Sequence, residues 1–195
     1  MRTITIIPAL LFSFFLETPS HSADFDKGLT AAQNGDFATA LKEWEPLAEQ
    51  GLAKAQFNLG VMHEYGDGVP QDYKEAVRLY RLAADQGFAK AQFNLGVMYE
   101  YGHGVPQDYK EAVRLYRLAA EQGFADAQYN LGTYYANGTG VVQDFMYAHM
   151  WLNIAASNGS DKGNKKKVEG KLTTSDISEA QRLARECVKK NYKGC

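Results

Sequence analysis

The eight residues AQFNLGVM occur at 55–62 and again, letter for letter, at 91–98. At a period of 36, the segments 55–90 and 91–126 agree at 32 of 36 positions, and 127–162 is a third, more divergent copy. A duplicated unit of this length cannot bury its apolar residues alone, so successive copies must stack on one another. The period therefore predicts an array of structural repeats in place of one globular core.

The first half of each unit has the pattern of an amphipathic helix. Ala55, Leu59 and Met62 follow helical spacing and predict a helix over about 55–65. Gly60 lies in its middle, where glycine costs roughly 1 kcal/mol of helix propensity relative to alanine. We therefore expect another helix to approach closely at Gly60.

The second half of each unit predicts a second helix. The segment GDGVPQD at 66–72 contains two glycines and a proline and cannot continue the first helix. Asp72, with Glu75 three residues later, predicts a capping box that opens a helix at Tyr73, and Gly87 suits a left-handed C-terminal cap. The apolar stripe of this helix is Ala76, Val77, Tyr80, Ala83 and Ala84. Each unit is thus an antiparallel helix hairpin, and the predicted fold is an all-α, right-handed solenoid.

Shortened versions of the pattern flank the three copies. Residues 37–54 align with 73–90, with Trp44 in the place of Tyr80, and Thr173 is predicted to cap a final helix. We expect a signal peptide over 1–22, a shortened N-terminal helix hairpin over 24–54, repeats over 55–90, 91–126 and 127–162, and C-terminal capping helices over 163–195.

The first residues predict export. Arg2 precedes the apolar stretch ITIIPALLFSFFL at 4–16, which gives way to small and polar residues. This stretch is too short to span a bilayer, which needs about 20 residues. We expect cleavage after Ser22, with cleavage after Ala23 as the alternative. The cleaved chain is predicted to be soluble, without stable membrane insertion, in a bacterial periplasm or outside the cell.

Two cysteines, Cys187 and Cys195, lie near the C-terminus. In an oxidising compartment an isolated close pair predicts a disulfide, and the spacing is not that of a C-x-x-C redox site. If the helix continued between them, the two Cα atoms would be separated by about 12 Å, whereas a disulfide needs roughly 4.4 to 6.8 Å. The last helix must therefore end before Cys195.

The charge pattern argues against a nucleic-acid partner. The net charge is -2, and no run of one sign is longer than Lys165, Lys166 and Lys167. Three charges without interleaved aromatic residues are too few to follow a phosphate backbone, so a solvated helix face is expected there. We expect no nucleic-acid partner, no metal and no cofactor.

The recurring positions resemble those of the Sel-1-like repeat, a relative of the tetratricopeptide repeat. In the second copy they are Ala91, Leu95, Gly96, Tyr99, Gly102, Gly104, Val105, Asp108, Ala112, Tyr116, Ala119, Ala120 and Gly123. His63 in place of tyrosine, Val142 in place of proline and the displaced Trp151 depart from the pattern. The resemblance covers nearly all of 24–190 and implies a scaffold for protein–protein or peptide interaction. Some cysteine-rich relatives are linked to penicillin binding and to β-lactamases, so a β-lactam-directed or cell-wall-directed hydrolase is the alternative.

The candidate catalytic residues do not combine into a known arrangement. No serine has a lysine three residues later, and Thr39 with Lys42 is the nearest approach to the S-x-x-K pattern. His63, His103 and His149 are not spaced to bind one zinc ion, and His63 is interpreted as a packing substitute for tyrosine. We therefore predict a non-catalytic protein.

Glu64 and Glu100 suggest a glycosidase hypothesis, because such enzymes use paired carboxylates. Positions one repeat apart are separated by about 10 Å or more across stacked helices, which is too far for most acid–base pairs. Two solvated surface carboxylates are the preferred interpretation.

The stripe of the first helix that faces away from its hairpin partner is the predicted binding surface. A ligand lying along the concave face of a solenoid meets the same position once in every repeat. The predicted peptide-binding residues are Phe57, Asn58, Tyr65, Phe93, Asn94, Tyr101, Tyr129 and Asn130. Asparagine amides can meet a peptide's backbone donors and acceptors, while aromatic rings cover its side chains. The same residues could instead wedge between helices or tie one repeat's backbone to the next, and the sequence leaves both roles open.

Overall fold

The structure is a computed structural model that describes residues 23–161 and 163–195. Within these residues the chain forms helices joined by turns and contains no strand. The helices are α1 (Phe25–Gln33), α2 (Phe37–Glu49), α3 (Ala53–Tyr65), α4 (Tyr73–Asp85), α5 (Ala89–Tyr101), α6 (Tyr109–Ala120), α7 (Ala125–Asn137), α8 (Phe145–Ser157), α9 (Asn164–Glu169) and α10 (Thr174–Lys189). The all-α prediction is confirmed.

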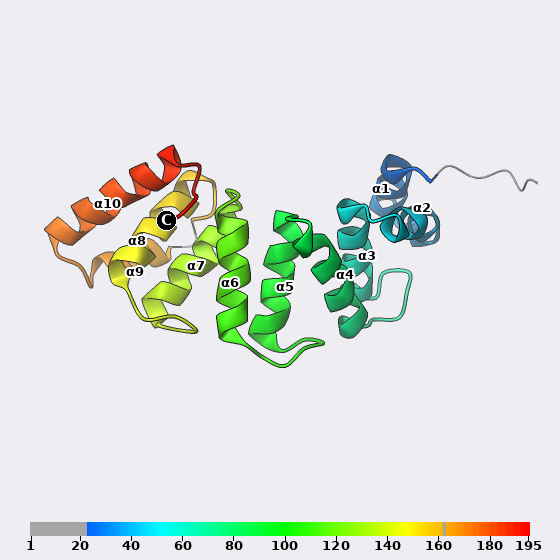
Figure 1. The fold of residues 1–195 in the computed structure, drawn as a ribbon, viewed down its shortest axis with the longest axis horizontal. Helices are drawn as coiled ribbons and strands as arrows, with labels where there is room; N and C mark the ends of the chain where they lie inside the picture. The colour runs from blue at the N-terminus through cyan, green and yellow to red at the C-terminus, as the bar shows by residue number, and fades with distance from the viewer. Residues whose placement is uncertain (1–22, 162) are drawn as a thin grey trace, which may run out of the picture.

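The helices form consecutive antiparallel hairpins that stack along the long axis of the molecule. Figure 1 shows the chain progressing from α1 at one end to α10 at the other, so each hairpin adjoins the next one in sequence. The end of the array differs, because α10 packs against α8. The solenoid prediction is therefore confirmed. The predicted signal peptide at 1–22 lies outside the described residues, and no described helix is long and apolar enough to cross a membrane.

Side-chain caps define where the second helix of each hairpin begins. The Asp72 carboxylate accepts hydrogen bonds from the backbone N–H groups of Lys74 at 2.9 Å and Glu75 at 3.1 Å. The predicted capping box is only half formed, because the Glu75 side chain accepts hydrogen bonds from Arg78. A carboxylate can gain more from a bidentate guanidinium than from one backbone N–H. Gly87 has a φ of +84°, which confirms its left-handed cap.

The two helices of a hairpin touch at a glycine. A Cβ atom placed on Gly60 would lie 2.7 Å from the ring of Tyr80, and one placed on Gly96 would lie 2.8 Å from the ring of Tyr116. Only a residue without a side chain leaves room for the tyrosine ring at this point. The close approach predicted for Gly60 is thus confirmed, and its partner is the second helix of the same hairpin.

Buried glutamines connect one repeat to the next. Gln92 of α5 donates from Nε2 to the carbonyl oxygen of Ala84 in α4, at 3.2 Å. Its Oε1 accepts a hydrogen bond from Gln122, at 2.7 Å, after the end of α6. The equivalent contacts are Gln56 with Ala48 and Gln86, and Gln128 with Ala120 and Asn158. Since unpaired buried amides are costly, these glutamines specify how far one repeat sits from the next.

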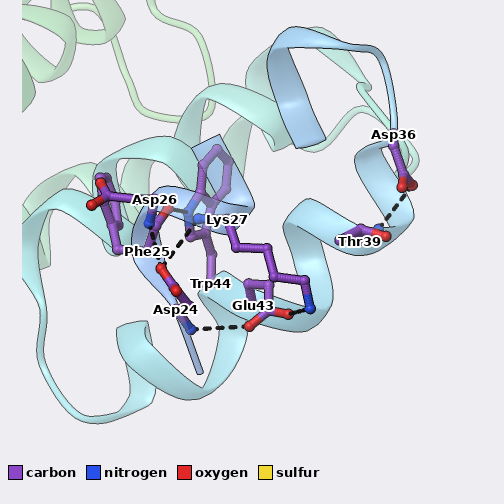
Figure 2. A network of polar contacts seen from close by, with 8 residues as sticks. All are labelled: Asp24, Phe25, Asp26, Lys27, Asp36, Thr39, Glu43 and Trp44. Carbon is purple, nitrogen blue, oxygen red and sulfur yellow. Dashed lines mark hydrogen bonds and ion pairs between the residues drawn. The ribbon is translucent and has the colours of Figure 1, made fainter. Parts of the chain in front are cut away.

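The first hairpin closes the N-terminal end with a different set of contacts. Trp44 takes the place of Tyr80, as predicted, and its Nε1 donates to the carbonyl oxygen of Phe25 at 3.1 Å. Figure 2 shows the buried Glu43 side chain between the Lys27 ammonium, at 2.6 Å, and the backbone N–H of Asp24, at 3.0 Å. A buried carboxylate remains charged only when it is paired and hydrogen-bonded in this way.

The C-terminal end is closed by α10. Thr173 caps this helix, and the Thr173 and Asp176 side chains form a complete capping box. The buried Ala184 and Cys187 of α10 join the core formed by α6, α7 and α8. Helix α10 ends at Lys189, after which the chain turns back. Cys187 and Cys195 are joined by a disulfide, with their Cα atoms 5.6 Å apart.

Candidate functional site

The predicted binding stripe lies on α3, α5 and α7, and its members differ in exposure. Tyr65 and Tyr101, at the ends of α3 and α5, leave 66% and 61% of their surface exposed. Phe57 is half-buried between the rings of Tyr80 and Phe88, with centroid distances of 5.7 and 5.3 Å. The two exposed tyrosines therefore contribute little to the packing of the array, whereas Phe57 wedges between helices.

The rings equivalent to Phe57 in the next two copies are also half-buried. Phe93 packs against Tyr116 and Phe124, with ring centroids 5.6 and 5.1 Å apart. Tyr129 is half-buried, and its hydroxyl accepts a hydrogen bond from Asn164 at 2.6 Å. These three rings, Phe57, Phe93 and Tyr129, thus present one side to the neighbouring helices and one side to the surface.

The asparagines of the stripe connect repeats through tyrosine hydroxyl groups. Asn94 of α5 donates from Nδ2 to the Tyr80 hydroxyl of α4, at 3.1 Å. Asn130 of α7 lies beside the Tyr116 hydroxyl of α6, in the equivalent place. The tie to the neighbouring backbone that was considered for the asparagines is made by the glutamines described above. Asn58 is half-buried on α3, where the preceding hairpin has Trp44 in the tyrosine position.

Each tyrosine hydroxyl also reaches a carboxylate of its own hairpin. Tyr80 donates to Glu64 Oε2 at 2.5 Å, and Tyr116 donates to Glu100. Burial raises the pKa of both hydroxyl groups, and the hydrogen bonds to the carboxylates raise these pKa values further. Glu64 and Glu100 are half-buried and accept hydrogen bonds from buried tyrosines, so the interpretation as solvated surface carboxylates is wrong.

These contacts form a polar bridge at the junction between the first two full repeats, from Glu64 through Tyr80 to Asn94. At the next junction Tyr116 donates to Glu100, and Asn130 lies beside the Tyr116 hydroxyl. The series ends in the third repeat, where Ala136 and Leu152 replace the glutamate and the tyrosine. Sequence reasoning missed the bridges, although a tyrosine in a buried stripe requires a partner for its hydroxyl.

A cluster of aromatic rings lies beside the exposed end of the stripe. His103 stacks on Tyr73 and on Tyr101, with ring centroids 4.8 and 5.8 Å away. The charge of Glu100 raises the pKa of Tyr101, and burial of the Tyr101 hydroxyl raises this pKa further. The cluster combines flat apolar surfaces with hydroxyl and carboxylate groups, which is the chemistry of a protein-binding surface.

The residues considered for catalysis have other roles in the described structure. The backbone N–H of Thr39 donates to Asp36 Oδ1 at 3.1 Å, so Thr39 serves the Asp36 cap of α2, as Figure 2 shows. His149 is fully buried, with its Nε2 3.1 Å from Glu169 Oε1. Within the described ranges, no group of three histidine, cysteine, aspartate or glutamate residues could hold a metal ion.

Comparison with known proteins identifies the repeat. A family model described as Sel1 repeat matches residues 53–88, 89–124 and 125–160. The fold is similar to a Sel1 repeat protein from Oxalobacter formigenes, with 29% identity and a TM-score of 0.68 over 84% of this chain and 75% of that one. It is also similar to a protective antigen of uropathogenic Escherichia coli strains displaying an SLR fold, with 27% identity and a TM-score of 0.60 over 86% of this chain and 46% of that one.

Two curated relatives share a shorter segment. The DAP3-binding cell death enhancer 1 proteins of Rattus norvegicus and Mus musculus are 36% and 34% identical over 50 residues, which is 26% of this chain. The matched segment covers 10% of their length.

Proposed function

The chain belongs to the Sel1 repeat family, and we propose that it is an exported, non-catalytic scaffold that binds a protein or peptide along the concave face lined by α3, α5 and α7. The resemblance noted from the recurring residues is confirmed by the three matched repeats. The proposed partner lies across successive repeats and meets equivalent side chains on each first helix. The name of the curated relatives describes them as binding another protein, and they share 50 residues with this chain.

The observation that carries the proposal is the exposure of Tyr65 and Tyr101. These rings occupy the same position in two nearly identical repeats and remain 66% and 61% exposed, although stacking buries most aromatic side chains around them. Tyrosine supplies a large contact area together with one hydroxyl group, and it is enriched where proteins bind one another. Packing alone does not explain two exposed tyrosines at this repeat position.

The polar groups beside these rings add specificity to the proposed surface. The Asn94 side chain uses one N–H on Tyr80, and no hydrogen bond of its second N–H or its carbonyl oxygen is found among the described residues, so both can meet a ligand. Glu64 and Glu100, oriented by Tyr80 and Tyr116, would favour backbone N–H groups or basic side chains. The proposed occupant is therefore an extended peptide segment with aromatic or aliphatic residues and few acidic ones.

We also propose that the protein acts in a bacterial periplasm or outside the cell. The apolar segment at 4–16 supports secretion, and the Cys187–Cys195 pair suits an oxidising compartment. The mass of the chain recovered from the envelope fraction of its host would place the N-terminus at Ala23 or Asp24. Recovery of an intact N-terminus from the cytoplasm would contradict export.

A site-specific cross-linking experiment tests the binding face. A photoreactive phenylalanine analogue is introduced at Tyr101, and an otherwise identical protein carries it at Val188, an exposed position on α10. Irradiation in the envelope fraction should capture a discrete partner at Tyr101 and not at Val188. Equal capture at both positions would contradict the proposed face.

Loss of the surface should weaken binding without unfolding the protein. Asn58→Ala should weaken binding with little effect on stability, because within the described residues no hydrogen bond of the Asn58 side chain is found. The triple change N58A, N94A and N130A should weaken the binding of the captured partner further, and it should lower the melting temperature because two contacts with tyrosines are lost.

Hydrolysis of a chromogenic β-lactam by the purified protein would instead favour the hydrolase alternative, provided that controls exclude contaminants.

A further inference from the structure

A second surface lies on the opposite side of α3 from the binding stripe. A cleft of about 440 Å³ is formed there between α2 and α4, with α3 as its floor. We call it the first cleft, and its lining includes Glu45, Glu49, Leu59, His63, Arg78 and Leu82. Positions 57, 58, 61 and 65 point away from it by helical spacing, so it is separate from the surface proposed above.

An equivalent cleft lies one repeat later, and there the chain's own Arg81 is part of the lining. This second cleft, of about 390 Å³, is lined by residues 36 positions further along the chain, including Leu95, Arg114 and Leu118. Arg81 stands at the position equivalent to Glu45, and its guanidinium donates to the Tyr99 hydroxyl at 3.0 Å. The third junction has the same pair, with Arg117 donating to Tyr135 at 2.8 Å.

The first cleft departs from this pattern at both positions of the pair. Glu45 replaces the arginine, and His63 replaces the tyrosine that accepts its hydrogen bond. The chain therefore supplies its own guanidinium at two junctions and supplies none at the equivalent position of the first. Because 55–90 and 91–126 are otherwise nearly identical, the second cleft is an internal reference for the first.

The charges that line the two clefts differ accordingly. The first has three carboxylates and one guanidinium, from Glu45, Glu49, Glu75 and Arg78. The second has two of each, from Arg81, Asp85, Glu111 and Arg114. The first cleft is therefore the more negative by two charges.

Two carboxylates of the first cleft are available to a ligand. Arg78 binds Glu75 through two hydrogen bonds, at 2.6 and 2.8 Å, and so neutralises that carboxylate. Glu45 and Glu49 are exposed, one helical turn apart on α2, and neither joins an ion pair within the part of the chain that the structure describes. His63 lies in the floor of the cleft, and its buried Nδ1 atom lacks a hydrogen-bond partner among the described residues.

We propose that the first cleft binds an arginine side chain of a partner protein, in the place that Arg81 takes in the second cleft. The planar guanidinium matches the two free carboxylates of Glu45 and Glu49, which a compact ammonium group would satisfy less fully. Leu59 and Leu82 would cover the methylene groups of the arginine stem. The proposal is independent of the concave face, and it gives the scaffold a second contact surface on its other side.

Nuclear magnetic resonance titration of the full exported chain with N-acetyl-arginine amide tests this proposal. Saturable shifts are expected for backbone amides around His63 and Glu45, and N-acetyl-citrulline amide, which is nearly isosteric but uncharged, should bind at least about ten-fold more weakly. Equal binding of both compounds, or no saturable shift at these amides, would overturn the proposal.

Two reciprocal double variants provide matched controls. Glu45→Arg with His63→Tyr converts the first cleft into a copy of the second and should abolish arginine binding. Arg81→Glu with Tyr99→His converts the second cleft into a copy of the first and should create a second arginine site around residue 99. Each change installs residues that the chain already uses at that repeat position, so both proteins should fold, and circular dichroism checks this. If the first variant fails to fold, Glu45→Gln decides alone, and unchanged affinity in it would reject the site.

Discussion

Tyr80 and Tyr116 occupy one position in two successive repeats, and each hydroxyl donates to a carboxylate of its own hairpin. Tyr80 donates to Glu64 at 2.5 Å and accepts from Asn94 at 3.1 Å. A phenol can do both at once, since it has one donor and acceptor lone pairs. The ring fills the space beside Gly60. A single side chain thus supplies packing within a repeat and hydrogen bonding between repeats.

Tyr80→Phe should lower the free energy of unfolding by about 1–3 kcal/mol, because it keeps the ring but leaves Glu64 and Asn94 without their partner. Chemical denaturation followed by circular dichroism measures the change. Tyr101→Phe is the matched control, because its exposed hydroxyl should change stability by less than about 0.5 kcal/mol. Equal losses in the two variants would show that the bridge contributes no stability.

The raised pKa values of Tyr80 and Tyr116 predict an alkaline loss of stability. Because each pKa is higher in the folded than in the unfolded chain, the stabilisation is complete below about pH 10 and is lost as the pH rises further. Thermal melts across this range should show a falling melting temperature, with buried phenols ionising only as the fold opens. The double variant Y80F, Y116F should show a shallower decline, and an unchanged slope would contradict the assignment.

At the scale of the helices, each hairpin depends on one close contact and each end depends on a cap. Within the repeats the contact is between a glycine of the first helix and a large side chain of the second. At the C-terminal end, α10 covers α8 and the chain then turns back to bring Cys195 to Cys187. Helix propensity alone would favour residues other than glycine at the contact within each hairpin, so packing determines the residue there.

Gly96→Ala should destabilise the protein although alanine is the better helix former. The added methyl group would lie 2.8 Å from the Tyr116 ring, and overpacking of this kind costs about 1–3 kcal/mol, against a gain of about 1 kcal/mol in propensity. Chemical denaturation measures the net change in the free energy of unfolding. Lys90→Ala, at an exposed position of α5, is the control and should be neutral or slightly stabilising; a stabilised Gly96→Ala protein would contradict the packing argument.

Removal of the disulfide should loosen only the C-terminal end. Closing so short a loop contributes about 2.5 kcal/mol by the chain-entropy estimate, and it acts where the last helix would otherwise fray. In the double variant C187A, C195A, hydrogen exchange should quicken in the last turns of α10 and remain unchanged in α3 to α6. Mass spectrometry of non-reduced exported protein provides the direct check, and two free thiols in it would contradict the pairing.

At the scale of the whole molecule, stability is a sum over repeats and their junctions. Buried side chains form clusters that each cross a junction, such as the one that joins Ala83 and Ala84 of α4 to Ala91 and Leu95 of α5. Each hairpin contacts its sequence neighbours, and at the C-terminal end this contact is made by α9 and α10 with α8. An array of this kind tolerates the removal of a unit when the new junction repeats the old one.

Deletion of 91–126 should give a folded, shorter solenoid. The third repeat would then meet 55–90, where Gln128 finds Ala84 in the place of Ala120 and Asn130 finds Tyr80 in the place of Tyr116. Circular dichroism should show a helix signal reduced in proportion to the lost helices α5 and α6, with a cooperative melt at lower temperature. An unfolded product would disprove the modular interpretation.

The sequence by itself determined the period, the all-α hairpin fold, the caps at Asp72, Gly87 and Thr173, and the close approach at Gly60. These features are local or strictly periodic, so residue type and spacing specify them without knowledge of distant partners. The exposed Tyr65 and Tyr101 were also placed on one stripe by helical spacing alone. Their role in binding remains a proposal.

Only the tertiary structure decided which distant polar groups meet. The sequence pattern favours a solvated Glu64 and gives no role to Gln92, yet Glu64 accepts a hydrogen bond from Tyr80 and Gln92 joins Ala84 to Gln122. Likewise, His63 was interpreted as a packing substitute, and its position opposite Glu45 in a cleft emerged from the arrangement of α2, α3 and α4. Helical periodicity states which face a residue occupies, but the partner on the facing helix depends on the rotation and distance at which the hairpins stack, and these are set by the packing of many side chains together.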